Sequence, residues 1–124
     1  MADDLSTLVF TTASAAVITK ARGATIIAFR IPAAVDNSAV RLGLEASFDG
    51  GTTYSYVAID DGGVATNYRP FWAVSQLVVL DPTVIYAIQG ARTVRVTLYA
   101  ADGTTAASQT ATTLGVVYAQ IVER

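Results

Sequence analysis

The side chains that most often carry out chemistry in proteins are largely missing from this sequence. It has no histidine and no cysteine, which excludes His-based triads, thiol nucleophiles and the commonest transition-metal ligands. Glycoside hydrolysis needs two carboxylates flanking the scissile bond, but Glu45 and the penultimate Glu123 are the two glutamates of the chain. Glu45 lies on the polar face of a predicted strand, where a salt bridge explains it. We expect no catalytic residue, no cofactor and no enzymatic activity.

Three aspartates are the nearest approach to a cation site. Asp49, Asp60 and Asp61 offer the oxygen ligands that Ca²⁺ prefers. They fall at or near opposite ends of one predicted strand, about 35 Å apart by the rise of an extended chain. This hairpin alone cannot bring them to one ion, so we expect no metal.

Aromatic side chains near predicted turns form a second candidate group, which comprises Tyr54, Tyr56, Tyr68, Phe71 and Trp72. Such rings stack on sugars in carbohydrate-binding modules. On β-sandwiches they are more often core or subunit-interface residues. Both interpretations stay open, and we favour core or interface roles, with Tyr68, Phe71 and Trp72 as predicted interface residues.

The stretch that must position these residues runs from Val40 to Ile59. Apolar residues alternate strictly with polar or small ones across its first half, at Val40, Leu42, Leu44, Ala46 and Phe48. This period of two predicts a half-buried β-strand. The Asp-Gly-Gly-Thr-Thr segment that follows is rich in turn residues, and residues 54–59 are again extended in character. The stretch predicts a β-hairpin.

The turn of this hairpin fits the pattern Ser-x-Asp-x-Gly-x-Thr-aromatic. The predicted structural turn comprises Ser47, Asp49, Gly51, Thr53 and Tyr54. The pattern resembles the Asp box of sialidase-like propellers, in which the aspartate locks the turn and the aromatic ring packs beneath it. A propeller needs several copies and this chain has one, so the match predicts a hairpin and not a glycosidase.

The remaining chain predicts further short strands separated by Gly, Asp and Pro turns. The extended segments are 24–31, 73–80, 92–99 and 114–122, and Asp60 to Gly63 forms a second tight turn. Asp81-Pro82 has the residues of a helix start, which predicts a single helical turn. Seven or eight short strands with almost no helical periodicity predict an all-β fold, an antiparallel β-sandwich or jelly roll with at most one short helical turn.

Residues 1–22 form the part of the chain with the weakest pattern, and residues 23–124 form the predicted sandwich domain. Leu8, Val9 and Phe10 have the composition of a strand, but serine and threonine dominate afterwards. The segment is either an edge strand or an arm that orders against a neighbour. In both cases we predict these three residues as interface residues.

Composition narrows the range of partners. With 52% hydrophobic and only 15% charged residues, the chain either hides part of its surface in an assembly or is a solitary alanine-rich domain. The net charge is −2 and no basic cluster exists, so we expect no nucleic-acid binding. No apolar run reaches the length of a membrane helix and no signal peptide is visible. We expect a soluble protein made in the cytoplasm.

The order of four motifs resembles a group of small proteins of tailed bacteriophages. Those proteins combine a strand ending in Pro-Ala-Ala, a Ser-x-Asp-Gly-Gly-Thr-Thr-aromatic turn, a Leu-Asp-Pro turn and a Gly-aromatic-Arg strand. The matching segments of this chain are 31–34, 47–54, 80–82 and 90–96. The resemblance spans about residues 24–124, and Ala91 stands where an aromatic residue is usual.

The resemblance implies a virion structural protein, with a capsid decoration (cement) protein as the first expectation. Its implied partners are the major capsid protein and copies of itself, with a trimer favoured, and its implied location is the capsid surface of a virion assembled from protein made in the host cytoplasm. Residues 1–22 and the Thr-rich loop 101–113 are the expected contact segments. A tail or baseplate component, or a surface carbohydrate-binding module, are the alternatives.

Overall fold

The computed structural model describes residues 5–10, 15–20, 24–33, 35, 40–109 and 112–120. In this part of the chain it has ten strands and one helix: β1 (Leu5–Phe10), β2 (Ala15–Thr19), β3 (Ala24–Arg30), β4 (Arg41–Ser47), β5 (Ser55–Tyr56), β6 (Ala58–Asp61), β7 (Val64–Asn67), β8 (Leu77–Val79), α1 (Pro82–Ile88), β9 (Thr93–Tyr99) and β10 (Thr112–Gln120). The predicted all-β class is confirmed.

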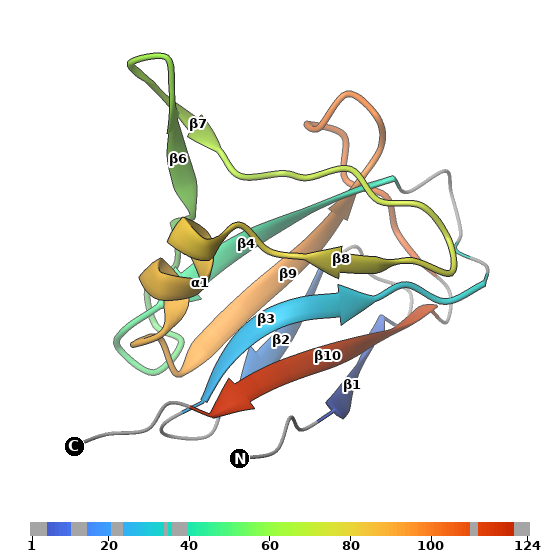
Figure 1. Cartoon of the computed structure of the whole chain (residues 1–124), viewed down its shortest axis with the longest axis horizontal. Coiled ribbons are helices and arrows are strands. Elements are labelled where there is room, and N and C mark those ends of the chain that lie inside the picture. Colours follow the sequence, from blue (N-terminus) through green and yellow to red (C-terminus); the bar gives the residue numbers. More distant parts are fainter. Residues whose placement is uncertain are drawn as a thin grey trace.

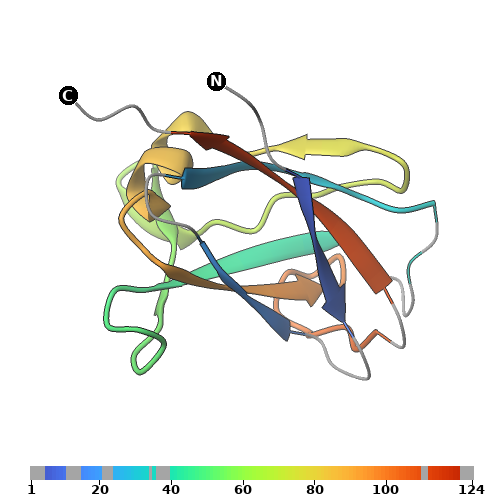
Figure 2. The ribbon, with the colours of Figure 1, turned by 90° about the horizontal axis from the view of Figure 1, so that it is seen from below.

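The strands form two four-stranded antiparallel sheets and a separate hairpin. The first sheet has the order β1-β10-β3-β8, the second has the order β2-β9-β4-β5, and β6 pairs with β7. The two sheets face each other as the layers of a sandwich (Figures 1 and 2). β10, the apolar strand near the C-terminus, lies between β1 and β3 in its sheet.

The core fills the space between the sheets with alternate residues of facing strands. Its largest fully buried side chains come from both layers, and they include Phe10, Ile26, Phe29, Leu42, Leu44, Leu98 and Leu114. The alternation predicted for residues 40–48 explains the burial of Leu42, Leu44 and Ala46, because the period of two places every second side chain on the inner face. Phe48, predicted on the same face, follows the end of β4 and is 67% exposed. The two sheets therefore bury one continuous hydrophobic core.

The described residues of the N-terminal segment are strands at the sheet edges. β1 pairs with β10 along its whole length, from Leu5 opposite Val117 to Phe10 opposite Thr112. β2 pairs with β9 in the other sheet. Leu8 and Ile18 are buried, so both strands contribute to the core. Residues 1–4, 11–14 and 21–23 lie outside the described part.

The helix α1 begins where the sequence predicts, and it is longer than the single turn expected. The Asp81 side chain accepts a hydrogen bond from the Thr83 N–H at 2.9 Å, with proline in the first turn. The helix spans seven residues. Val84 and Ile88, one turn apart, are buried against the core, and this packing stabilises a helix that is too short to form alone.

The strand predicted over residues 73–80 is confined to β8, Leu77–Val79. Ser75 interrupts it, since its φ of 62° is incompatible with an extended strand, and its N–H donates to the Pro32 carbonyl. The preceding segment pairs elsewhere: the Leu42 N–H donates to the Pro70 carbonyl and the Trp72 N–H to the Val40 carbonyl. Residues 70–72 therefore extend the edge of the second sheet beside β4.

Candidate functional site

The turn after β4 is built by two side chains of the Ser-x-Asp motif. The Ser47 hydroxyl donates to Asp49 Oδ1 at 2.8 Å and accepts from the Gly51 N–H at 2.8 Å. Asp49 Oδ1 also accepts from the N–H groups of Thr52 and Thr53, at 3.1 and 2.9 Å. These donors lower the pKa of Asp49 to about 2. The hydrogen bonds of the turn occupy Asp49 Oδ1, so the motif holds the backbone of the turn in place.

The aromatic residue of the same motif, Tyr54, contacts an ion pair on the outer side of the second sheet. The ring centroid of Tyr54 lies 4.2 Å from the guanidinium carbon of Arg95. Arg95 also binds Glu45 through two hydrogen bonds of 2.9 and 2.8 Å, across the β4–β9 pair. The salt bridge predicted for Glu45 is therefore present, with a strand neighbour as its partner, and the bond to Glu45 raises the pKa of Arg95.

Two further arginines tie loops onto this outer side. Arg41 lies 4.3 Å from the Phe71 ring centroid, and its Nε donates to the Arg69 carbonyl at 2.7 Å. Arg69 lies 4.2 Å from the ring centroid of Tyr99 and donates to the Gly103 carbonyl. Cation–π contacts of this kind are worth about 0.5–2 kcal/mol each. We call Arg41, Arg69 and Arg95 with the rings of Tyr54, Tyr56, Phe71 and Tyr99 the arginine–aromatic cluster.

The residues predicted as an interface divide into two groups. Leu8, Phe10 and Trp72 are buried at 5%, 0% and 6% exposure. This corrects the predicted interface role of these three residues, because their side chains fill the chain's own core and offer no surface to a partner. Tyr68 is half-buried, and its hydroxyl accepts from the Asp81 N–H at 3.0 Å. Val9 and Phe71 remain exposed at 53% and 62%, but they lie on different sheets.

The outer side of the first sheet carries exposed aliphatic residues, of which the sequence analysis predicted Val9 as an interface residue and did not consider Leu77 and Val79. Val117 lies opposite Ala28, which lies opposite Val79, so that these residues form one row across three strands. The next row joins Gly115, Arg30 and Leu77 in the same way. Leu77 and Val79 are 56% and 65% exposed. We call Val9 on the edge strand β1, Leu77 and Val79 on the opposite edge strand β8, and the half-buried Val117 of β10 the apolar face, which also carries the exposed Arg30. In the sequence, the signal for this exposed face was that residues 77–79 are all apolar, which places apolar side chains on both faces of the strand.

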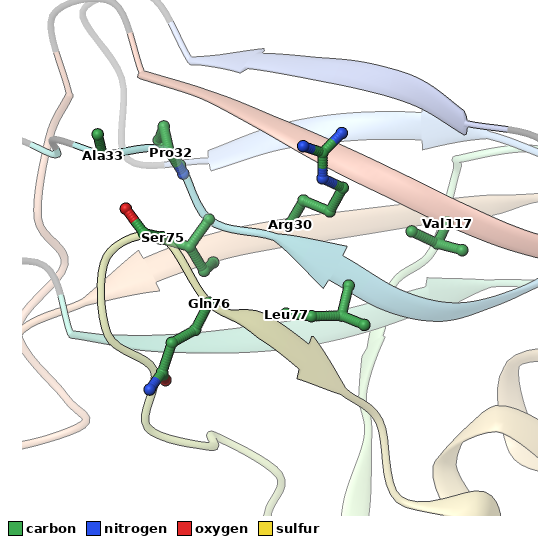
Figure 3. Close-up of a pocket in the computed structure, with 8 residues that line it drawn as sticks. Arg30, Pro32, Ala33, Ser75, Gln76, Leu77 and Val117 are labelled. Atoms are coloured by element: carbon green, nitrogen blue, oxygen red, sulfur yellow. The ribbon is translucent and has the colours of Figure 1, made fainter.

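An open hollow lies at one end of the apolar face. Its volume is about 630 Å³. The end of β3 and the residues after it, the segment leading into β8, and one residue of β10 line it. These residues are Arg30, Ile31, Pro32, Ala33, Ser75, Gln76, Leu77 and Val117. Figure 3 shows Arg30 between Pro32 on one side and Leu77 and Val117 on the other. The hollow thus combines a cation with aliphatic walls, which suits a partner bearing a carboxylate beside an apolar group.

The aspartates considered for a cation belong to separate turns. Asp49 binds backbone N–H groups of its own turn, and Asp60 accepts from the Gly63 N–H at 2.8 Å in the β6–β7 hairpin. Within the described residues, no three acidic side chains gather into a group able to hold a metal ion. Over the same residues, α1 is far too short to cross a bilayer and no other helix is present.

Comparison of the chain with protein-family models, with curated proteins and with solved structures finds no match in any of the three.

Proposed function

We propose that this chain is a non-enzymatic structural protein of a bacteriophage virion, a capsid decoration (cement) protein. In this role it binds the capsid surface and stabilises it through contacts with the major capsid protein and with copies of itself, a trimer being the favoured oligomer. The motif order over residues 24–124 and the exposed surface of the first sheet support the proposal.

The observation that carries the proposal is the apolar face. Val9, Leu77 and Val79 expose 53%, 56% and 65% of their surface on one side of one sheet. A lone domain gains nothing from leaving such residues in water, whereas covering them contributes about 25 cal/mol per Å² of buried apolar area. A protein whose task is to cover another surface has a direct use for this face.

A capsid-binding experiment tests the proposal. The chain is co-expressed with the major capsid protein of the genome that encodes it, and the particles are sedimented to measure the bound fraction. We expect wild type to co-sediment with the particles. The Val79→Asp variant should be absent from the particle fraction, because the new charge would be buried at the contact. Tyr86→Asp is the matched control, since Tyr86 is 78% exposed on α1, outside the apolar face. Failure of wild type to co-sediment contradicts decoration.

A tail or baseplate component is the alternative within the same class of protein. The neighbouring genes distinguish the two: a major capsid gene beside this one favours decoration, and tail-tube or baseplate genes favour the tail. Co-sedimentation with purified tails in place of capsids gives the same answer at the protein level.

A surface carbohydrate-binding module is the alternative from another class, and the exposed rings of Phe71 and Tyr56 favour it. They are 62% and 55% exposed within the arginine–aromatic cluster. Phe71→Ala and Tyr56→Ala are the variants for a glycan-binding screen. Trp72 is unsuitable because it is a core residue, and replacing it would report on folding.

A further inference from the structure

β8 forms one end of the first sheet (Figure 1). It pairs with β3 on one side, and among the described residues no strand pairs with its other side. The strand at the opposite end of the sheet, β1, lies against β2 of the second sheet. The free edge of β8 is therefore the end of this sheet to which a further strand can be added.

The hydrogen bonds on either side of β8 fix which of its residues bond to β3. The Leu80 N–H donates to the Ile27 carbonyl at 2.9 Å, and the Ile31 N–H donates to the Gln76 carbonyl at 2.8 Å. Bonded pairs alternate with non-bonded pairs in an antiparallel ladder, so every second residue of this segment bonds to β3. Val78, midway between Gln76 and Leu80, is therefore the residue of β8 that bonds to β3.

Leu77 and Val79 point their backbone groups the other way. They lie opposite Arg30 and Ala28 in non-bonded pairs, so their N–H and C=O groups are directed at the free edge. Among the described residues, no backbone partner lies on that side, and the two residues are 56% and 65% exposed. The edge thus offers two donors and two acceptors, the pattern that recognises an extended chain.

This edge lacks the features that usually keep a sheet edge from pairing. Charged side chains, prolines and bulges block most exposed edges, but residues 71–80 contain no charged residue and no proline, and the β3–β8 register is continuous. The side chains of Leu77 and Val79 lie on the outer face, because Val78 between them is buried. An uncharged, apolar strand therefore matches this edge.

We propose that β8 of one copy pairs antiparallel with β8 of a second copy, across a two-fold axis at Val78. In this register Leu77 of each copy lies opposite Val79 of the other copy, and the free backbone groups of these residues form four hydrogen bonds between the copies. The same pairing places the two aliphatic side chains side by side on the outer face. The donors, acceptors and apolar side chains of the edge are thus all matched by a second copy of the same edge.

Symmetry and charge favour a second β8 over other strands. A two-fold contact uses the free edge of both copies and closes, whereas pairing of β8 with β1 of another copy leaves further edges free and extends into an open chain. Three strand spacings, about 14 Å, separate the two β3 strands that carry Arg30. Since this exceeds the Debye length of about 8 Å at physiological salt, repulsion between the two arginines is screened.

The contact goes beyond the proposed function and does not rest on it. It joins copies in pairs, so it is separate from any contact that builds a trimer. Because it uses the edge of the first sheet, it leaves the outer faces of both copies open on one side of a continuous sheet.

A proline at the free edge tests the contact. Val79→Pro removes an N–H that does not bond to β3, at an edge position where a sheet tolerates proline, and it removes two of the four bonds between the copies. Light scattering after size-exclusion chromatography should give wild type an even number of 12.9 kDa subunits. Val79→Pro should weaken pairing by about tenfold or more and, below its pairing concentration, show half the wild-type mass.

Ala65→Pro is the matched control. Asp61 and Val64 flank a two-residue hairpin loop and form a bonded pair, so Ala65 belongs to the next, non-bonded pair and its N–H points away from β6. The variant makes the same chemical change on the exposed strand β7, outside the contact, and it should keep the wild-type mass. Circular dichroism of both variants checks that the sandwich remains folded.

Two further measurements test the register. The chain has no cysteine, and the two-fold axis places the thiols of Val78→Cys in a non-bonded pair with Cα atoms about 4.5 Å apart, within disulfide range. Oxidised glutathione should therefore link two copies, as seen on a non-reducing gel, and should leave the control Tyr86→Cys on α1 unlinked. Leu77→Glu/Val79→Lys sets opposite charges across the contact and should pair, whereas Leu77→Glu/Val79→Glu sets like charges and should not.

The contact is overturned if wild type contains a single subunit or an odd number of subunits, if Val79→Pro keeps the wild-type mass, or if Val78→Cys links no faster than Tyr86→Cys. Co-sedimentation with capsids is a separate readout. Wild type that binds capsids without pairing through β8 keeps the decoration role and loses only this contact. Wild type that pairs through β8 and does not bind capsids keeps this contact and loses the decoration role.

Discussion

Gly43 lies against the ring of Tyr99 on the outer side of the second sheet. A Cβ at Gly43 would lie 2.7 Å from Tyr99 Cε2 and 3.3 Å from Arg69 Cγ. Tyr99 is 7% exposed and lies beneath the Arg69 guanidinium. The missing side chain at Gly43 therefore makes room for the ring on which Arg69 and its loop rest.

Gly43→Ala is expected to lower the free energy of unfolding by about 1–3 kcal/mol, the usual cost of overpacking. Urea denaturation measures the change. Gly90→Ala is the matched control, because its Cβ would meet only Phe48 Cε1, at an ordinary 3.7 Å, and its stability should stay within about 0.5 kcal/mol of wild type. Equal stability of both variants would contradict the close packing at Gly43.

The Glu45–Arg95 pair should show measurable coupling. Two hydrogen bonds join the two side chains. The Glu45 side chain is 11% exposed and the Arg95 side chain is 37% exposed. A double-mutant cycle with Glu45→Gln and Arg95→Met should give a coupling energy of about 1 kcal/mol, since exposure of Arg95 screens the pair. A second cycle of Glu45→Gln with Arg92→Met should give none. Equal coupling in both cycles would argue against a specific pair.

Acid should destabilise the protein through Asp49 and Asp102. Backbone and side-chain donors hold the pKa of each at about 2, below the ordinary 3.8; for Asp102 these come chiefly from Thr105. Their contribution is complete above pH 3.8 and is lost as pH falls through about 2, because protonation removes the negative charge that these donors stabilise. The double variant Asp49→Asn/Asp102→Asn should flatten this part of the stability–pH curve. A curve as steep as that of wild type would contradict the assignment.

Neighbouring residues of β1 should differ sharply in their effect on stability. Phe10 is fully buried, whereas Val9 is 53% exposed on the opposite side of the strand. Phe10→Ala should cost about 3–5 kcal/mol in unfolding free energy, and Val9→Ala about 0.5 kcal/mol or less. Chemical denaturation of the two variants measures the difference. Similar small effects would mean that β1 contributes little to the core.

Lys20 should make stability rise with pH in the alkaline range. Its ammonium donates to the carbonyls of Ala24 and of Gln89, at the C-terminus of α1, and burial lowers its pKa from 10.5. Between the lowered pKa and 10.5 the unfolded chain binds more protons, so unfolding free energy rises with pH. Lys20→Met should remove this rise and Arg92→Met should keep it, as measured by urea unfolding up to pH 10. Persistence of the rise in Lys20→Met would assign it to another group.

Local patterns were enough to predict the fold class and several elements. Strict alternation identified β4 and its inner residues Leu42, Leu44 and Ala46, since side chains of a strand point to opposite faces in turn. The turn residues around Asp49 and the Asp81-Pro82 helix start could be predicted because their hydrogen bonds join residues close in sequence.

The tertiary structure alone decided which residues form the surface. Leu8 and Trp72 belong to the core and Leu77 and Val79 to the exposed face because β1 joins β10 and residues 70–72 join β4, pairings between segments far apart in the chain. A local pattern cannot specify such pairing, since a strand of apolar residues fits the inside or the edge of a sheet equally well. The Glu45 partner of Arg95, the Gly103 carbonyl that binds Arg69 and the Gln89 carbonyl that binds Lys20 depend on the same long-range arrangement, because these contacts join residues 34 to 69 positions apart in the chain.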